Sequence, residues 1–183
     1  MKGMVFTEFI EMVEQTFGVE VADDIITTSG LPSGGAYTSV GNYDHREMLS
    51  MVGALSAQTG VPLPDLTRAF GRYLFGRFST LYPAFFEGVT NAFDMLERID
   101  GYIHVEVRKL YSDAELPRIT MKQAADGGAR LVYRSARPFA GVAEGLILGC
   151  IEHFGENITI QRDAGADDGT QAEWVLTRVP QPA

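Results

Sequence analysis

Residues 131–138 read Leu-Val-Tyr-Arg-Ser-Ala-Arg-Pro, and an aromatic hydroxyl, an aliphatic hydroxyl and a guanidinium recur at every second position. Side chains of a β-strand alternate between its two faces, so Tyr133, Ser135 and Arg137 are predicted to share one face of a strand over 130–137. Such a row of donors suits a ligand with two acidic groups, because an arginine can hold a carboxylate with two parallel hydrogen bonds. A surface strand with a polar face would give the same pattern, so the motif needs a second observation.

That second observation comes from residues 100–111, which read Asp-Gly-Tyr-Ile-His-Val-Glu-Val-Arg-Lys-Leu-Tyr. The middle of this stretch alternates like a strand, but Ile103, Val107 and Leu110 also share one helical face. The helical patterns before it and the basic residues at its end favour a helix. His104 lies beside the apolar face. A histidine there is more commonly a hydrogen-bonded core residue than a ligand, although a neutral imidazole is also a frequent metal ligand.

The bulk composition narrows the class of protein. The chain has 183 residues, 45 % of them hydrophobic, which indicates one folded domain rather than a disordered chain. Its net charge of −9 makes nucleic acid and anionic membranes poor partners. Cys150 is the only cysteine, which excludes an intramolecular disulfide and gives no support to a cysteine-based zinc site or to covalent haem attachment. Neither a membrane span nor a signal peptide is expected, so the sequence predicts a cytoplasmic domain.

The first part of the chain has helical patterns. Apolar spacing predicts helices over 4–17, about 21–27, from Asp44 to Gly60, from Pro64 to about residue 78, and over 91–98. Asp44 followed three residues later by Glu47 predicts a capping box. The glycine-containing segment 30–41 lacks the Gly-Lys-Ser/Thr ending of a phosphate-binding loop, so it is interpreted as a connector.

The pattern changes to strands after Pro117. Strands are predicted over 118–122, 130–137, 157–162 and 173–179, with a hairpin turn at 125–128 and an acidic loop at 164–169. A helix is predicted to start at Pro138 and to end at Gly155. The expected fold is α+β: a helical N-terminal part of about 110 residues packed with a small antiparallel sheet and its helix.

Together, Tyr-x-Ser-x-Arg at 133–137 and an upstream helical histidine before a proline-containing turn resemble the haem nitric oxide/oxygen binding (H-NOX) family. That family comprises the sensor domain of soluble guanylate cyclases and stand-alone bacterial proteins. The resemblance covers essentially the whole chain and includes residues 35–39 (Gly-Ala-Tyr-Thr-Ser) and Leu110-Tyr111. It implies a single haem-binding sensor domain over 1–183. A helical subregion would cover about 1–60 and a haem-holding subregion about 61–183. The haem would be buried between the helical N-terminal part and the small antiparallel sheet with its helix.

The resemblance also implies roles for individual residues. His104 would be the proximal iron ligand of a non-covalently bound haem b. The hydroxyls of Tyr133 and Ser135 and the guanidinium of Arg137 would hold the two haem propionates, as buried carboxylates need paired donors. Further positions match residues that contact the macrocycle in the family: Pro117, which presses on the porphyrin, and Val5 and Leu146, which pack against it.

One difference from the oxygen-binding members of this family bears on which gas the protein binds. Oxygen-binding members stabilise dioxygen with a distal tyrosine, helped by a tryptophan and an asparagine. The corresponding positions here are Val142, Phe9 and Leu74, and none of these side chains donates a hydrogen bond. A missing donor in a dry pocket costs dioxygen affinity on the order of 1–3 kcal/mol, whereas nitric oxide needs no such donor.

The sequence therefore predicts a haem-based nitric oxide sensor that also binds carbon monoxide and has no catalytic activity of its own. The expected output is a conformational change: the gas weakens the bond to His104, the helix shifts, and the contact of Pro117 relaxes. The resemblance suggests a histidine kinase or a cyclic-di-GMP enzyme as the partner. Two alternatives stay open: an oxygen-binding haem sensor, and a haem-free interaction or lipid-binding domain. A visible spectrum of the purified protein distinguishes them.

Overall fold

The computed structural model describes residues 1–125, 127–163 and 168–180. Asp126 of the predicted hairpin turn and residues 164–167 of the predicted acidic loop lie outside the described residues. The chain forms two compact units, Met1–Phe70 and Gly71–Ala183, here called the N-terminal and C-terminal units. The boundary falls within helix α4 (Leu63–Leu81). None of the described helices is both long and apolar enough to cross a membrane.

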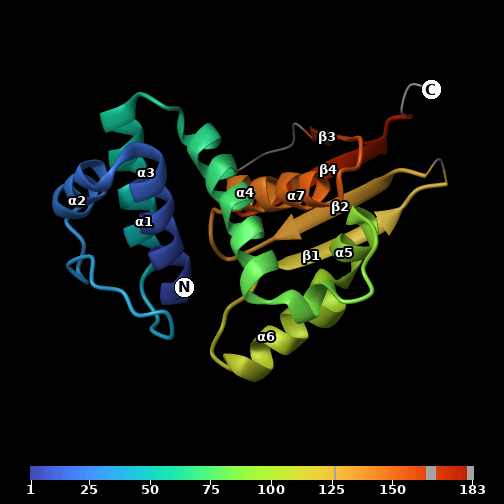
Figure 1. Ribbon diagram of the computed structural model, residues 1–183, viewed down its shortest axis with the longest axis horizontal. Coiled ribbons are helices and arrows are strands. Elements are labelled where there is room, and N and C mark those ends of the chain that lie inside the picture. Colours follow the sequence, from blue (N-terminus) through green and yellow to red (C-terminus); the bar gives the residue numbers. More distant parts are fainter. Residues whose placement is uncertain (126, 164–167, 181–183) are drawn as a thin grey trace. The chain divides into compact units, whose positions relative to one another are not determined.

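The N-terminal unit is built from α1 (Gly3–Phe17), α2 (Val19–Thr28), α3 (His45–Thr59) and the start of α4 (Figure 1). Gly18 separates α1 from α2 with a φ of 98°, a conformation that favours glycine, and Gly60 ends α3 in the left-handed region. The apolar stripes of these helices form the buried core of the unit: Phe6, Phe9, Val13, Ile25, Met48, Met51 and Leu55.

The connector after α2 is fastened to α3 by a buried carboxylate. Glu47, only 6 % exposed, accepts hydrogen bonds from the Tyr37 hydroxyl at 2.9 Å and from the Ser33 hydroxyl. Asp44 caps α3 by accepting from the backbone N–H of Arg46 at 2.9 Å. The predicted capping box is therefore wrong in its second half, because Glu47 turns to the connector, where its charge finds two donors.

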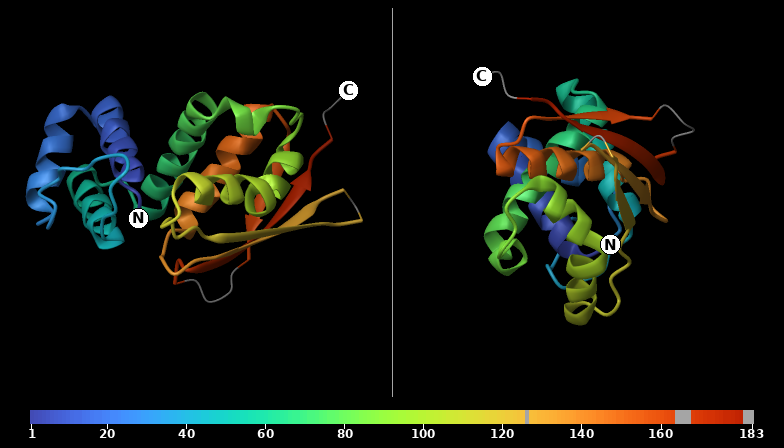
Figure 2. Two further views of the ribbon diagram at one scale, coloured as in Figure 1. Left: turned by 90° about the horizontal axis from the view of Figure 1, so that it is seen from below. Right: turned by 90° about the vertical axis from the view of Figure 1, so that its right-hand side faces the viewer.

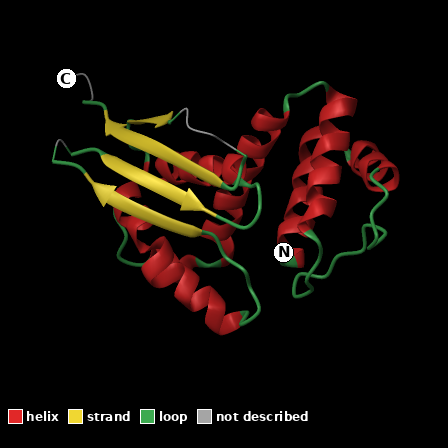
Figure 3. Cartoon of the chain, turned by 180° about the vertical axis from the view of Figure 1, so that it is seen from behind, coloured by secondary structure: helices red, strands yellow, loops and turns green. Residues whose placement is uncertain are grey.

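The C-terminal unit contains an antiparallel sheet with the strand order β1-β2-β4-β3. Its strands are β1 (Arg118–Gln123), β2 (Ala129–Arg134), β3 (Ile158–Arg162) and β4 (Gln171–Arg178). Along β2 the residues alternate between buried and less buried positions, so one face of the sheet carries the core. Figure 3 shows the helices of this unit behind that sheet, on one of its faces. The predicted α+β class is confirmed.

Helix α7 (Ala140–Phe154) packs on the sheet and on α4. Its Ile147 and Cys150 belong to the same buried cluster as Tyr133 and Trp174 of the strands. The backbones of α7 and α4 approach each other closely. A Cβ added to Gly71 would lie 2.2 Å from the carbonyl oxygen of Val142, and one added to Gly149 would lie 2.8 Å from Cβ of Phe75. Glycine is required at these positions for the helices to approach so closely.

The predicted helix over 100–111 is present, but its first turn has an unpredicted form. Helix α5 (Ala92–Arg98) continues into η2, a turn of π-helix (Ile99–Ile103), and then into α6 (His104–Leu110), a run that can be followed in Figure 2. The backbone N–H of His104 donates to the carbonyl oxygen of Ile99, five residues earlier. Such π turns hold one residue more than an α-helical turn and are frequent at functional sites.

Candidate cofactor site

His104 lies at the junction of η2 and α6, with its side chain only 11 % exposed. Its Nδ1 lies 2.8 Å from Oδ1 of Asp100, one turn earlier. Burial lowers the pKa of His104, helped by the positive charge of Arg108, although Asp100 acts in the opposite direction. The imidazole is therefore neutral near pH 7. With Nδ1 occupied by the carboxylate, Nε2 keeps a lone pair that can bind a metal.

The predicted donor row is brought together, but not by a single strand. Strand β2 ends at Arg134, so the predicted strand over 130–137 is wrong for its last three residues. Tyr133 is buried on the core side of β2, whereas Ser135 and Arg137 lie in the following turn. The backbone N–H of Ser135 donates to the carbonyl oxygen of Thr170 at 2.8 Å, and that of Arg137 donates to Oγ of Ser135 at 3.0 Å. A turn rather than a strand therefore holds Ser135 and Arg137 in position.

The three side chains still act on one another. Burial raises the pKa of Tyr133, while hydrogen bonds with Ser135 and the backbone of Phe139, together with the charge of Arg137, lower it in part. Because burial is the largest cause, Tyr133 stays protonated at neutral pH and keeps a donor. The cluster therefore combines two hydroxyls with a guanidinium, a set that suits carboxylates.

In this structure the guanidinium of Arg137 already binds a carboxylate. The side chain of Arg137 is 17 % exposed, and its Nη2 donates to the carboxylate of Glu115, which is 74 % exposed. Nη1 also donates to the main-chain oxygen of Glu115 at 3.3 Å. An ion pair with so exposed a partner contributes little, about 0–1 kcal/mol, so a better-placed carboxylate could displace Glu115. The residues present therefore fit a cofactor with acidic groups.

The other predicted contact residues of the C-terminal unit come from α4, α7 and the segment just before β1. Leu146 packs against the buried cluster that contains Tyr133, and Pro117 is half-buried just before β1. Leu74 is buried on α4, one turn after Gly71, and Val142 is half-buried on α7, where Gly71 meets its backbone. Leu74 and Val142 thus come from two helices in direct contact, and neither can donate a hydrogen bond.

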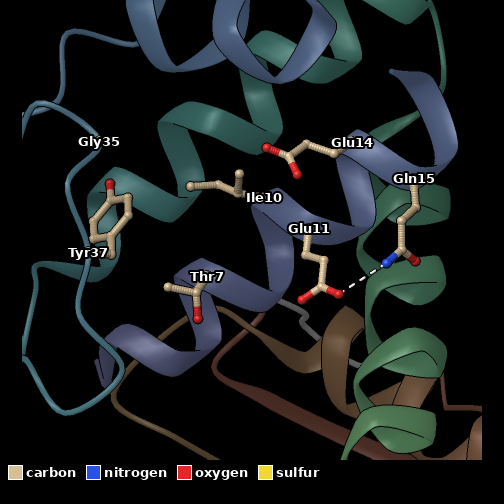
Figure 4. Close-up of a pocket in the computed structure, with 7 residues that line it drawn as sticks. All are labelled: Thr7, Ile10, Glu11, Glu14, Gln15, Gly35 and Tyr37. Carbon is tan, nitrogen blue, oxygen red and sulfur yellow. Dashed lines mark hydrogen bonds between the residues drawn. The ribbon is translucent and has the colours of Figure 1, made fainter. Parts of the chain in front are cut away.

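The two remaining predicted residues belong to the N-terminal unit. Val5 is half-buried on α1, and Phe9 is fully buried there, with its ring edge-on to that of Phe70 at a centroid distance of 5.1 Å. This unit also has an open hollow of about 500 Å³ between α1 and the connector (Figure 4). Figure 4 shows Glu11 and Glu14 on α1 and Tyr37 on the connector around it. None of the predicted site residues lines this hollow.

Two residues of the site were not predicted from the sequence. Asp100 is four residues before His104, a spacing that makes a contact within a helix visible from sequence alone. Glu115 has no such signal, because it reaches Arg137 across 22 residues of chain. Cys150 is buried, and burial raises its pKa to about 12, so its thiol stays protonated at neutral pH.

Comparisons with known proteins relate both units to one family. The model of the haem-NO-binding family matches residues 2–162. Among solved structures, an unliganded Fe(II) H-NOX protein from K. algicida is 36 % identical with a TM-score of 0.92, over 99 % of this chain and 98 % of that one.

Two further structures agree. An H-NOX protein from Shewanella woodyi in the Fe(II)CO state is 44 % identical with a TM-score of 0.84, over 100 % of this chain and 97 % of that one. An H-NOX protein from S. oneidensis in the Fe(II)NO state is 27 % identical with a TM-score of 0.89, over 98 % and 100 %. No curated sequence matches. The chain belongs to the haem-NO-binding (H-NOX) family, whose members are haem-based gas sensors with haem iron as their cofactor.

Proposed function

We propose that this chain is a sensor of nitric oxide in which His104 binds the iron of a non-covalent haem b. The observation that carries the proposal is a buried, neutral histidine whose Nδ1 is occupied and whose Nε2 remains for a metal. The adjacent Ile103 packs on the same buried cluster as Tyr133, the first of the three carboxylate-binding residues. Haem bound there would supply an iron with an open coordination position for a diatomic gas.

Tyr133, Ser135 and Arg137 are proposed to hold the haem propionates, with Arg137 exchanging the carboxylate of Glu115 for one of them. Buried carboxylates need such donors, and the planar guanidinium binds them in a two-pronged geometry that a lysine would lose. Pro117, Val5 and Leu146 are proposed to contact the macrocycle. The sensor domain is proposed to cover the whole of 1–183.

The choice of nitric oxide rests on the apolar side chains at positions 74 and 142. Leu74 and Val142 offer no donor to a bound gas, and the same holds for Phe9 of the N-terminal unit. Dioxygen depends on such a donor for much of its affinity, whereas nitric oxide and carbon monoxide do not. An oxygen sensor is the second candidate only insofar as the family includes both kinds.

The proposed output is a change in conformation that a separate enzyme reads, a histidine kinase or a cyclic-di-GMP enzyme in the cytoplasm, with no catalysis by the chain itself. The feature that supports it is the position of His104 at the junction of a π turn and α6, where a pull on the ring acts directly on the helix. Such a change signals only if the partner binds the two conformations with different affinity.

The test is the spectrum of the ferrous protein and of His104→Gly. We expect the variant to lose the wild-type ferrous spectrum and to regain it when imidazole fills the vacated position. His45→Ala, which removes a histidine of the N-terminal unit, serves as the control and should keep the spectrum. If His104→Gly keeps the wild-type spectrum without imidazole, His104 is not the ligand. If the wild type has no Soret band after reconstitution, the domain does not bind haem.

A further inference from the structure

The contact between Asp100 and His104 gives the carboxylate control over the other ring nitrogen. Oδ1 of Asp100 lies 2.8 Å from Nδ1 of His104, and both side chains are mostly removed from solvent, with exposures of 30 % and 11 %. The π turn of η2 contains Asp100 and ends just before His104, so the two residues are held by one continuous helical run. The acceptor is therefore part of the same rigid element as the ring.

A carboxylate in this position changes the imidazole in three ways. It requires the proton to be on Nδ1, it fixes the orientation of the ring, and it increases the electron density on Nε2. A charged acceptor does this more strongly than a main-chain carbonyl, because hydrogen bonds to an ionised group are roughly twice as strong as neutral ones. Nε2 then becomes a stronger ligand than an unassisted imidazole.

We propose that Asp100 is a positioning residue that sets how tightly His104 binds iron, and through that bond how readily the sensor releases its histidine. This inference rests on the proposed role of His104 and adds to it a residue that controls the strength of the bond. A stronger bond resists release when a gas binds, so the carboxylate would adjust the response of the sensor without touching the gas.

A simpler role would explain the same contact. An acid and a histidine four residues apart stabilise a helix through their side chains, whatever the histidine binds. That role predicts a change in thermal stability and no change in the electronic character of the ring. The two explanations therefore differ in a spectroscopic property of the iron–histidine bond.

The experiment compares wild-type protein with Asp100→Asn and Asp100→Glu, all loaded with haem and reduced. The frequency of the iron–histidine stretching vibration is read by resonance Raman spectroscopy, and the rate of haem loss is read by transfer to excess apomyoglobin. Asp100→Asn keeps the shape of the side chain and removes its charge. We expect a lower frequency and roughly 10-fold or more faster haem loss, the effect typical of removing a partner of a metal-binding histidine. Asp100→Glu restores the charge and should recover the frequency in part.

The matched control is Glu106→Gln, which removes one negative charge from α6. Glu106 pairs with Lys109 at 2.6 Å rather than with the histidine, so the frequency should stay at the wild-type value. If Asp100→Asn keeps the wild-type frequency, or if Glu106→Gln lowers it equally, the proposed role of Asp100 is overturned. A failure of the proposed function looks different: His104→Gly would then keep the vibration of the wild type.

Discussion

Replacing Arg137 with alanine is expected to weaken haem retention more than replacing Ser135. The side chain of Arg137 is 17 % exposed, and its guanidinium already binds a carboxylate, that of Glu115. Removing it would leave a mostly buried haem propionate without its charged partner. A hydrogen bond to a charged group contributes about 1.5–3 kcal/mol, and each 1.4 kcal/mol corresponds to a factor of ten, so haem loss should accelerate roughly 10- to 100-fold. The neutral hydroxyl of Ser135 contributes about 0.5–1.5 kcal/mol, which predicts a change of roughly 2- to 10-fold.

The assay follows transfer of haem to excess apomyoglobin through the change in the Soret band. Arg137→Lys, which keeps the charge and loses the planar fork, should fall between the alanine variant and the wild type. Arg130→Ala is the matched control, because Arg130 is an exposed arginine of β2, the strand that precedes the turn of Arg137, and it pairs with Glu173 on the solvent side of the sheet. Equal rates for Arg137→Ala and Ser135→Ala, or an effect of Arg130→Ala as large as theirs, would refute the assigned roles.

Two other substitutions test the wall formed by α4 and α7. Val142→Tyr should raise dioxygen affinity by a factor of roughly 10 to 100, which is the effect of one hydrogen bond in a dry pocket. Carbon monoxide affinity is measured in parallel and should fall only if the new ring clashes with its neighbours. Gly71→Ala should destabilise the protein by about 1–3 kcal/mol, since its Cβ would lie 2.2 Å from the carbonyl oxygen of Val142, and thermal unfolding measures this. Gly76 is on the same helix, and a Cβ added to it would have no atom within 4 Å. Gly76→Ala should therefore stabilise the protein by about 0.5–1 kcal/mol, and equal effects of the two alanine substitutions would contradict this reasoning.

The sequence predicted the helices and strands well where apolar periodicity was strong, and it was less accurate where tertiary contacts decide the local geometry. The strand expected to include Ser135 and Arg137 ends at Arg134, and beyond it the backbone N–H of Arg137 donates to Oγ of Ser135 rather than to a neighbouring strand. Tyr133, Ser135 and Arg137 were expected to come together because they alternate along one strand. They come together instead because a turn closed by the hydroxyl of Ser135 follows Tyr133.

Charged partners were the hardest feature to predict. Glu47 satisfied the pattern of a capping box, yet it accepts from Tyr37 and Ser33, whose connector carried no sign of being anchored. Likewise, the ion pair between Glu115 and Arg137 is visible only in the folded chain. Asp100 is the opposite case, because its spacing from His104 was visible in the sequence and follows the ordinary rule for helical neighbours.

The π turn of residues 99–103 has a consequence for the direction in which His104 can move. A π turn holds one residue more than an α-helical turn, and one residue corresponds to about 100° of rotation about the helix axis. If this turn adopted α-helical hydrogen bonding, α6 would twist about its own axis while α5 kept its hydrogen bonds. Each side chain of α6, including the exposed Val105 and Leu110, would then face a different direction. If His104 binds iron as proposed, its release from the iron would in that case change the pattern of side chains at the surface rather than displace the helix.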